Sequence, residues 1–227
     1  MRLLNWKSGI GVLVFICLMV SQAFSAKLLI PMDDTQKNHL KAYGIAYWVL
    51  QNEVDVEWLL NYKGGSFLIQ HLPSLEEECI IRGVTYKIIA DVQAANIMRE
   101  IADPEVNMEV VKLEKSPKIA VYSPKSKLPW DDAVTLVLTY AEIPYDVIYD
   151  TEIINNELPK YDWLHLHHED FTGQFGKFYS AYRNAPWYRQ QVQDAEADAL
   201  ALGYTKVSEL KRDVTIKIKE YTAGGGF

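Results

Sequence analysis

The second half of the chain alternates short apolar segments with helical ones, and this alternation restricts the fold more than any other feature. Apolar segments at residues 118–122, 145–149 and 162–166 are separated by helical patterns at residues 130–141 and 152–158. Parallel strands need a long crossover between them, and a helix is the usual crossover. The spacing therefore predicts an α/β fold with a parallel sheet and right-handed crossovers.

Two further helices are predicted after this region, at residues 186–202 and 207–221. The sequence then ends in Ala-Gly-Gly-Gly-Phe, at residues 223–227. Glycine commonly ends a helix, and a glycine turn of this kind normally leads into the next strand of an α/β sheet. We therefore expect the second domain, residues 118–227, to be incomplete where a core strand would begin. A natural flexible tail is the alternative.

The first half predicts a smaller mixed α/β domain at residues 26–111. Asp34 and Asp91 are the expected N-terminal caps of its two helices. A short, charged segment closed by Pro117 is the expected linker to the second domain. The expected elements are strands at residues 27–32, 54–62 and 67–69, a strand or hairpin at 79–90, helices at 34–50 and 91–101, and a linker at 112–117.

Residues 1–25 have the three parts of a secretory signal peptide. Arg2 and Lys7 supply positive charge, residues 10–20 are apolar, and residues 23–25 offer small side chains for cleavage. The apolar run is shorter than the roughly 20 residues of a spanning helix, so no permanent membrane anchor is expected. The chain is therefore expected to be exported to the periplasm or cell exterior. An N-terminal strand or core helix is the alternative.

Charge and cysteine content exclude two classes of protein. The formal net charge is −7, which argues against a nucleic-acid partner held by its phosphates. Signal cleavage would remove Cys17 and leave Cys79 as the one cysteine, so a disulfide scaffold is excluded. Cys79 lies in an apolar, strand-like run, and we interpret it as a small buried hydrophobe rather than a nucleophile.

The densest polar cluster follows the third strand predicted for the second domain, and it contains His165, His167, His168, Glu169 and Asp170. Ligands of open parallel sheets gather at the carboxyl ends of the strands, so these residues are candidate ligand-binding residues. Alternation places His165 and His167 on one face, where Glu169 could complete a metal site. Two alternatives remain: His165 packs in the sheet beside a solvated loop, or the cluster forms a hydrogen-bonded network. No catalytic residue or cofactor is identified.

An aromatic segment follows this cluster at residues 171–188. Its rings could line a groove for a small-molecule ligand, and Arg183 is a candidate for binding an anionic group. The alternative is that the rings are ordinary core residues, since aromatic side chains bury large areas wherever they occur.

Two segments resemble a family of exported bacterial proteins that often carry the label asparagine synthetase B. These are Leu-Ile-Pro-Met-Asp-Asp-Thr-Gln-Lys-Asn-His-Leu-Lys-Ala-Tyr-Gly at residues 29–44 and Trp-Leu-His-Leu-His-His-Glu-Asp-Phe-Thr-Gly at residues 163–173. The resemblance extends over the mature chain, and family members continue past residue 227. Asparagine synthesis from aspartate, ATP and glutamine is not expected. The chain has neither the N-terminal cysteine nor the Ser-Gly-Gly-x-Asp-Ser loop of those enzymes.

The second half is also similar to the class I glutamine-amidotransferase-like fold, a doubly wound, flavodoxin-like arrangement. The resemblance implies that a nucleophile elbow would follow the strand expected after Gly226, so no catalytic residue can be assigned within this chain. Three functions follow as hypotheses: an amidotransferase-like domain without its elbow, a metal-dependent hydrolase at residues 165–170, and a non-catalytic binding module of the cell envelope.

Overall fold

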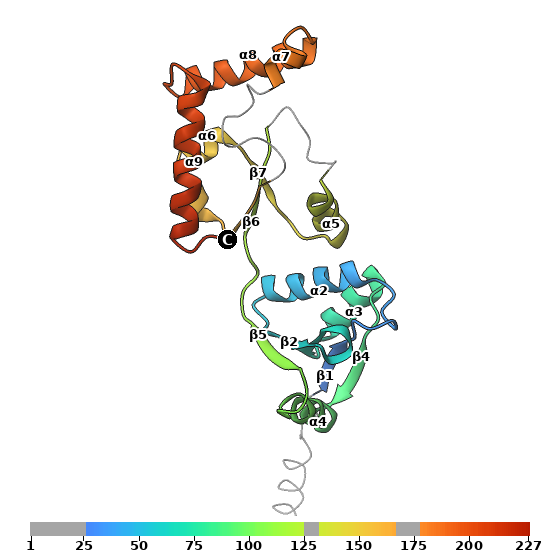
Figure 1. The fold of residues 1–227 in the computed structure, drawn as a ribbon. Coiled ribbons are helices and arrows are strands. Elements are labelled where there is room, and N and C mark those ends of the chain that lie inside the picture. The colour runs from blue at the N-terminus through green and yellow to red at the C-terminus, as the bar shows by residue number, and fades with distance from the viewer. Residues whose placement is uncertain (1–25, 125–131, 167–177) are drawn as a thin grey trace, which may run out of the picture. The chain divides into compact units, whose positions relative to one another are not determined.

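The computed structural model describes residues 26–124, 132–166 and 178–227. The chain divides into two compact units, Met1–Glu114 and Lys115–Phe227 (Figure 1). We call them unit 1 and unit 2, and each is considered by itself. Among the described residues, no helix is both long and apolar enough to cross a membrane.

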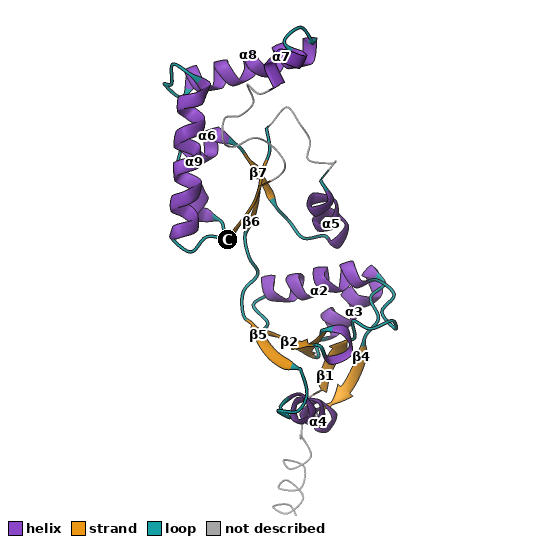
Figure 2. Cartoon of the chain, in the orientation of Figure 1, coloured by secondary structure: helices purple, strands orange, loops and turns teal. Residues whose placement is uncertain are grey.

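Unit 1 is built on one five-stranded sheet in which every pair of neighbouring strands is antiparallel. Figure 2 draws the strands in orange and the helices in purple. The order across the sheet is β4-β1-β3-β2-β5. Its elements are β1 (Ala26–Ile30), α2 (His39–Gln51), β2 (Val56–Leu60), the 3-10 turn η1 (Tyr62–Gly64), β3 (Ser66–Gln70), α3 (Pro73–Arg82), β4 (Lys87–Ala90), α4 (Asp91–Ile101) and β5 (Glu109–Leu113).

Both faces of this sheet are covered by helices, which explains the uninterrupted apolar runs Leu28–Ile30 in β1 and Phe67–Ile69 in β3. Successive side chains of a strand point to opposite faces. Leu28 and Ile30 pack with residues of α2 and α3, whereas Leu29 packs with residues of α4 on the other face. A strand buried on both sides needs apolar residues at every position, rather than at alternate ones.

The strand or hairpin predicted for residues 79–90 is wrong in its first part, because Cys79 lies in helix α3. Pro73 occupies the first turn of this helix, and Gly83 ends it with a φ of +68°. Leu75 and Cys79, four residues apart, form its fully buried face, whereas Ile80 is 65% exposed. Helical spacing of the buried residues therefore replaces the predicted strand, and β4 begins only at Lys87.

Two predicted helix caps and one boundary in unit 1 also differ from the structure. Asp91 is the first residue of α4, and Ala90 is the N-cap residue. Asn38, not Asp34, caps helix α2, and its side chain accepts a hydrogen bond from the Lys41 N–H. The charged segment interpreted as a linker is partly strand, because Lys112 and Leu113 belong to β5 and pair with β2. Pairing with a neighbouring strand overrides the polar character of this segment, since an edge strand tolerates charge.

The Cys79 thiol is expected to be inert in the folded protein. The side chain is fully buried, and burial raises the pKa of the thiol to about 12. In a Cys17→Ser variant, alkylation by iodoacetamide should be at least about a hundredfold slower before unfolding in urea than after it, because only the exposed thiolate reacts. Ile80→Cys in a Cys17→Ser, Cys79→Ala background is the exposed control on the same helix. Equal rates for the two cysteines would contradict the assigned burial.

Unit 2 contains a three-stranded parallel sheet in the order β7-β6-β8, so the predicted parallel pairing is confirmed. The first strand along the chain lies in the middle, and the next two flank it. The elements are β6 (Ile119–Tyr122), α5 (Ala133–Ala141), β7 (Asp146–Ile148), α6 (Asp150–Ile154), the 3-10 turn η2 (Leu158–Lys160), β8 (Trp163–Leu166), α7 (Tyr179–Tyr182), α8 (Pro186–Ala201) and α9 (Val207–Ala223).

The main core of unit 2 lies between the sheet and helix α9. Tyr122 and Leu164 point from the sheet into this cluster, and Leu210 and Val214 of α9 are almost completely buried against it. The apolar stripe predicted for residues 207–221 is therefore the packed face of α9.

The last residue, Phe227, lies alongside β8. Its N–H donates to the carbonyl of Asp162 at 3.1 Å, and its carbonyl accepts from the N–H of Leu164 at 2.7 Å. The N–H of Trp163 donates instead to Lys118, next to β6. Because successive N–H groups of a strand point in opposite directions, Phe227 lies on the side of β8 away from β6. It forms the two hydrogen bonds of a parallel bridge.

Candidate functional site

The order of the strands in unit 2 singles out one place at the carboxyl edge of its sheet. From β6 the chain passes to β7 on one side and then returns across β6 to β8 on the other. Successive connections that leave in opposite directions create a switch point, and ligands of open α/β sheets bind outside the carboxyl ends of the strands there. In unit 2 this place lies between the ends of β6 and β8.

His165 and Asp132 form a close pair at this switch point. His165 lies in β8, and its Nε2 is 2.8 Å from Oδ2 of Asp132. Both side chains are mostly buried, with exposed fractions of 19% and 14%. A neutral imidazole whose Nε2–H donates to the carboxylate leaves Nδ1 as a hydrogen-bond acceptor.

Asp132 is held in place by the helix that it caps. Its carboxylate accepts a hydrogen bond from the N–H of Thr135, in the first turn of α5. Burial alone would raise the pKa of the Asp132 carboxyl. The backbone N–H groups of Thr135 and Val134 and the nearby His165 outweigh burial, so the pKa lies below its usual range. Asp132 lies within the helical pattern predicted at residues 130–141, and the structure shows that it is the residue that caps α5.

Ser123 lies at the end of β6 and carries an unsatisfied hydroxyl. Its N–H donates to the carbonyl of Ile148, which continues the pairing with β7. The residue is 1% exposed, and its Oγ has no hydrogen-bond partner among the described residues. Val121 and His165 are register partners, so alternation puts Ser123 on the same face as His165. A buried hydroxyl without a partner costs about 1–3 kcal/mol.

The opposite face of the same edge holds a buried network around Lys211. Its Nζ lies 2.7 Å from Oδ2 of Asp150, and it donates to the hydroxyls of Tyr122 at 2.8 Å and Tyr149 at 3.2 Å. The Tyr122 hydroxyl also donates to Oδ1 of Asp150 at 2.6 Å. Burial and the neighbouring Asp150 carboxylate raise the pKa of Tyr122 far above its usual range. This network joins the ends of β6 and β7 to α9.

Sequence reasoning missed this network, although one signal was present. Lys211 lies four residues after Val207 and three before Val214, within the buried stripe of α9. A lysine inside an apolar stripe is seldom fully buried unless it is paired. Its partner could have been sought among the carboxylates at strand ends, such as Asp150.

Most of the predicted histidine cluster lies outside the described residues. His165 is the one member that the structure describes; the others are His167, His168, Glu169 and Asp170. The described parts of the chain contain no group of three or more histidine, cysteine or acidic side chains able to hold a metal. The metal site at His165, His167 and Glu169 therefore stays a prediction.

The predicted aromatic segment is described only from Phe178 onward. Tyr182 and Trp187 are exposed, and their ring centroids lie 5.2 Å apart. Tyr188, in contrast, is 4% exposed. Phe178 and Tyr179 are exposed as well. The core alternative therefore holds for Tyr188 but not for these four exposed rings. Arg183 follows α7 and is exposed, and its backbone N–H donates to the carbonyl of Tyr179.

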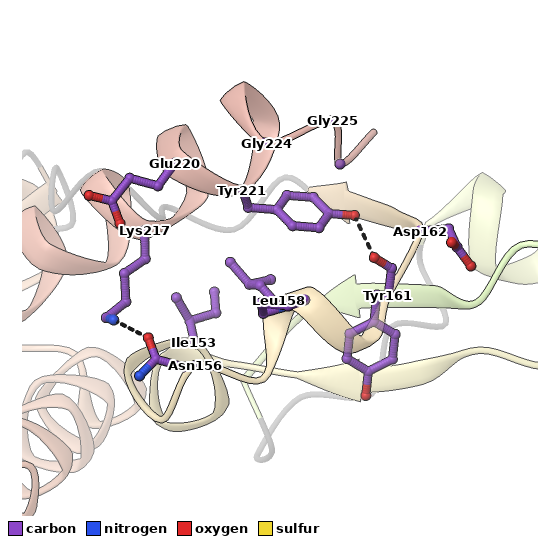
Figure 3. Close-up of a pocket in the computed structure, with 12 residues that line it drawn as sticks. Ile153, Asn156, Leu158, Tyr161, Asp162, Lys217, Glu220, Tyr221, Gly224 and Gly225 are labelled. Carbon is purple, nitrogen blue, oxygen red and sulfur yellow. Dashed lines mark hydrogen bonds between the residues drawn. The ribbon is translucent and has the colours of Figure 1, made fainter.

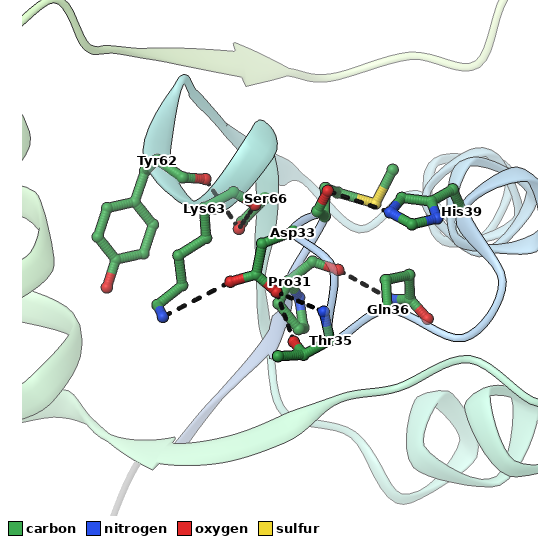
Figure 4. Close-up of polar contacts among 9 residues, drawn as sticks. Pro31, Asp33, Thr35, Gln36, His39, Tyr62, Lys63 and Ser66 are labelled. Atoms are coloured by element: carbon green, nitrogen blue, oxygen red, sulfur yellow. Dashed lines mark hydrogen bonds and ion pairs between the residues drawn. The ribbon is translucent and has the colours of Figure 1, made fainter.

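Asp33, in unit 1, serves the architecture of a loop (Figure 4). Its carboxylate accepts hydrogen bonds from the backbone N–H and the hydroxyl of Thr35, and it forms an ion pair of 3.7 Å with Lys63. Gln36 nearby is buried and donates to the carbonyl of Pro31 at 2.8 Å. Asp33 therefore shapes this turn and does not cap α2, whose capping residue is Asn38.

Comparisons of the chain with protein-family models, with curated proteins and with solved structures found no match.

Proposed function

We propose that unit 2 is a small-molecule-binding domain of the class I glutamine-amidotransferase-like type, in an exported protein of the family labelled asparagine synthetase B. The strand order supports this proposal. Counting along the chain, β7-β6-β8 is the order 2-1-3, and Phe227 lies where a fourth strand would pair. The flavodoxin-like, doubly wound sheet has the order 2-1-3-4-5. The periplasm or the cell exterior is the proposed location.

One observation carries the proposed site. The buried Ser123 hydroxyl, which has no partner among the residues that the structure describes, lies on the same face of the sheet as the His165–Asp132 pair. The hydroxyl can donate or accept a hydrogen bond, and Nδ1 of His165 can accept one. A carboxamide both accepts and donates, so it complements this pair of groups. We therefore assign these residues to ligand binding and assign no nucleophile.

The same pair of residues supports a second candidate, the metal-dependent site. Histidines that bind a metal commonly donate their other ring N–H to a carboxylate, which is the arrangement of His165 and Asp132. His167 and Glu169 would then complete the ligand set. This candidate differs from the first in requiring stoichiometric metal.

Isothermal titration calorimetry with L-glutamine tests the first proposal. We expect saturable binding to the wild-type chain, weakened about fivefold to tenfold by Ser123→Ala and by His165→Ala, because each removes one buried hydrogen bond of about 1 kcal/mol. His71→Ala is the matched control, since His71 forms a comparable 3.0 Å pair with Glu76 in unit 1.

Two results decide between the candidates. Binding that is absent, or unchanged in both unit 2 variants, would refute the carboxamide site. Elemental analysis of the same preparations covers the second candidate: one zinc or other transition metal per chain, lost in His165→Ala and kept in His71→Ala, would favour the metal site.

A further inference from the structure

Unit 2 has a cavity at the edge of its sheet opposite to the candidate site. The cavity has a volume of about 480 Å³ and lies between the end of α9, the glycine turn after it and the α6–η2 connection (Figure 3). Asp162, which precedes the first residue of β8, is part of its wall. The cavity therefore lies at the amino ends of the strands, and its volume is in the range of small-molecule sites.

The inner wall of this cavity is apolar and aromatic. Ile153 and Leu158 are almost completely buried beneath it, and the ring of Tyr221 lies above them (Figure 3). Gly226 packs directly on this ring, because a Cβ added at Gly226 would lie 2.2 Å from a ring carbon. The Tyr221 hydroxyl donates to the carbonyl of Tyr161 at 3.3 Å. The ring is thus held on two sides and forms part of the cavity wall.

Three charged residues line the cavity. Asp162 is already engaged by the backbone N–H of Lys118 and by the ammonium of Lys115, whereas Lys217 and Glu220 lie at the rim. Lys217 and Glu220 lie one turn apart on α9, and in Figure 3 both side chains lie at the same end of the cavity. Lys217 donates a hydrogen bond to the amide oxygen of Asn156. Among the described residues, Glu220 forms no ion pair. The carbonyl end of α9 adds partial negative charge near Glu220.

We propose that this cavity binds a free α-amino acid with an apolar side chain. The side chain lies on the ring of Tyr221 and against Leu158. The α-carboxylate pairs with Lys217, and the α-ammonium pairs with Glu220. A ligand that carries both charges satisfies both side chains, whereas an anion alone or a cation alone would face one group of its own sign. The proposal is independent of the carboxamide site at the other edge of the sheet.

Saturation-transfer NMR with L-phenylalanine as the probe tests this site in the full chain. We expect saturable binding that weakens about tenfold or more in Lys217→Met and in Glu220→Gln, because each substitution removes the charged partner of one ligand group. Lys219→Met is the matched control, since Lys219 is exposed on the same helix and does not line the cavity. His165→Ala should also leave binding unchanged, which separates this site from the proposed function.

Two altered probes assign the charges. N-acetyl-L-phenylalanine has no ammonium, so it should bind more weakly and lose its sensitivity to Glu220→Gln. L-Phenylalaninamide has no carboxylate, so it should lose its sensitivity to Lys217→Met. Absent binding of L-phenylalanine at 10 mM, or equal weakening by Lys217→Met and Lys219→Met, would overturn the proposal. The proposal would also be overturned if N-acetyl-L-phenylalanine binding stayed sensitive to Glu220→Gln and L-phenylalaninamide binding stayed sensitive to Lys217→Met.

Discussion

Lys211→Met is expected to lower the free energy of unfolding of unit 2 by about 3–5 kcal/mol, the usual cost of removing one member of a buried ion pair. Lys211 is 3% exposed, and its ammonium contacts Asp150 and two tyrosine hydroxyls. Methionine fills a similar volume but leaves the Asp150 carboxylate charged and buried. Urea unfolding, followed by hydrogen exchange resolved to peptides of each unit, measures the effect on unit 2 alone.

A double-mutant cycle separates the ion pair from simple loss of packing. Each single substitution leaves one buried charge without its partner, whereas the double variant Asp150→Asn, Lys211→Met removes both charges. The double variant should therefore be more stable than the sum of the two single losses predicts, by about 1–3 kcal/mol. Lys217→Met is the control on the same helix, since Lys217 lies at a partly exposed rim and should cost less than about 1 kcal/mol. Strict additivity would mean that the two charges do not interact.

The parallel sheet of unit 2 could be predicted because its signal is local. Each strand is a short apolar run, and each crossover has its own helical pattern, so the order of elements follows from the chain itself. Ile119–Tyr122 and Trp163–Leu166 lie within one residue of the predicted bounds. A doubly wound domain is a finer expectation, and it stays part of the proposal.

Unit 1 was harder to predict, because its pairings join distant segments. Strand β5 (Glu109–Leu113) carries two charges and overlaps the linker predicted at residues 112–117, yet it is the edge strand that pairs with Val56–Leu60. Helix α3 was hidden for a different reason. Its β-branched residues Ile80 and Ile81 suggested a strand, but they are exposed, and tertiary packing of Leu75 and Cys79 decides the element.

The sequence predicted one residue of the candidate site, His165. The other two, Asp132 and Ser123, were missed for the same physical reason: their role depends on contacts formed only in the packed structure. His165 could be predicted because a histidine near the end of a parallel strand lies at the ligand-binding edge. Its partner Asp132 lies 33 residues earlier, within the helical pattern predicted at residues 130–141, and was not among the predicted site residues. Ser123 directly follows the strand predicted at residues 118–122 and was not among them either. An unsatisfied hydroxyl is a property of the packed structure, so no sequence pattern reveals it.

Gly64→Ala is the second substitution with a large expected effect, this time on unit 1. Gly64 has a φ of +80°, and a Cβ at this position would lie 2.3 Å from the carbonyl oxygen of Met32. The two segments cannot easily separate, because the Met32 N–H donates to the carbonyl of Lys63 at 3.0 Å. Backbone strain and overpacking together should lower the free energy of unfolding of unit 1 by about 2–5 kcal/mol.

Gly83→Ala is the matched control that isolates the steric part of this effect. Gly83 also has a positive φ, +68°, but nothing lies within 4 Å of a Cβ there. It should therefore show the conformational cost alone, about 1 kcal/mol. Hydrogen exchange of unit 1 peptides in urea measures both variants. If the two alanines destabilise unit 1 equally, the close approach of Gly64 to Met32 contributes nothing, and the assigned packing of this loop on the end of β1 is wrong.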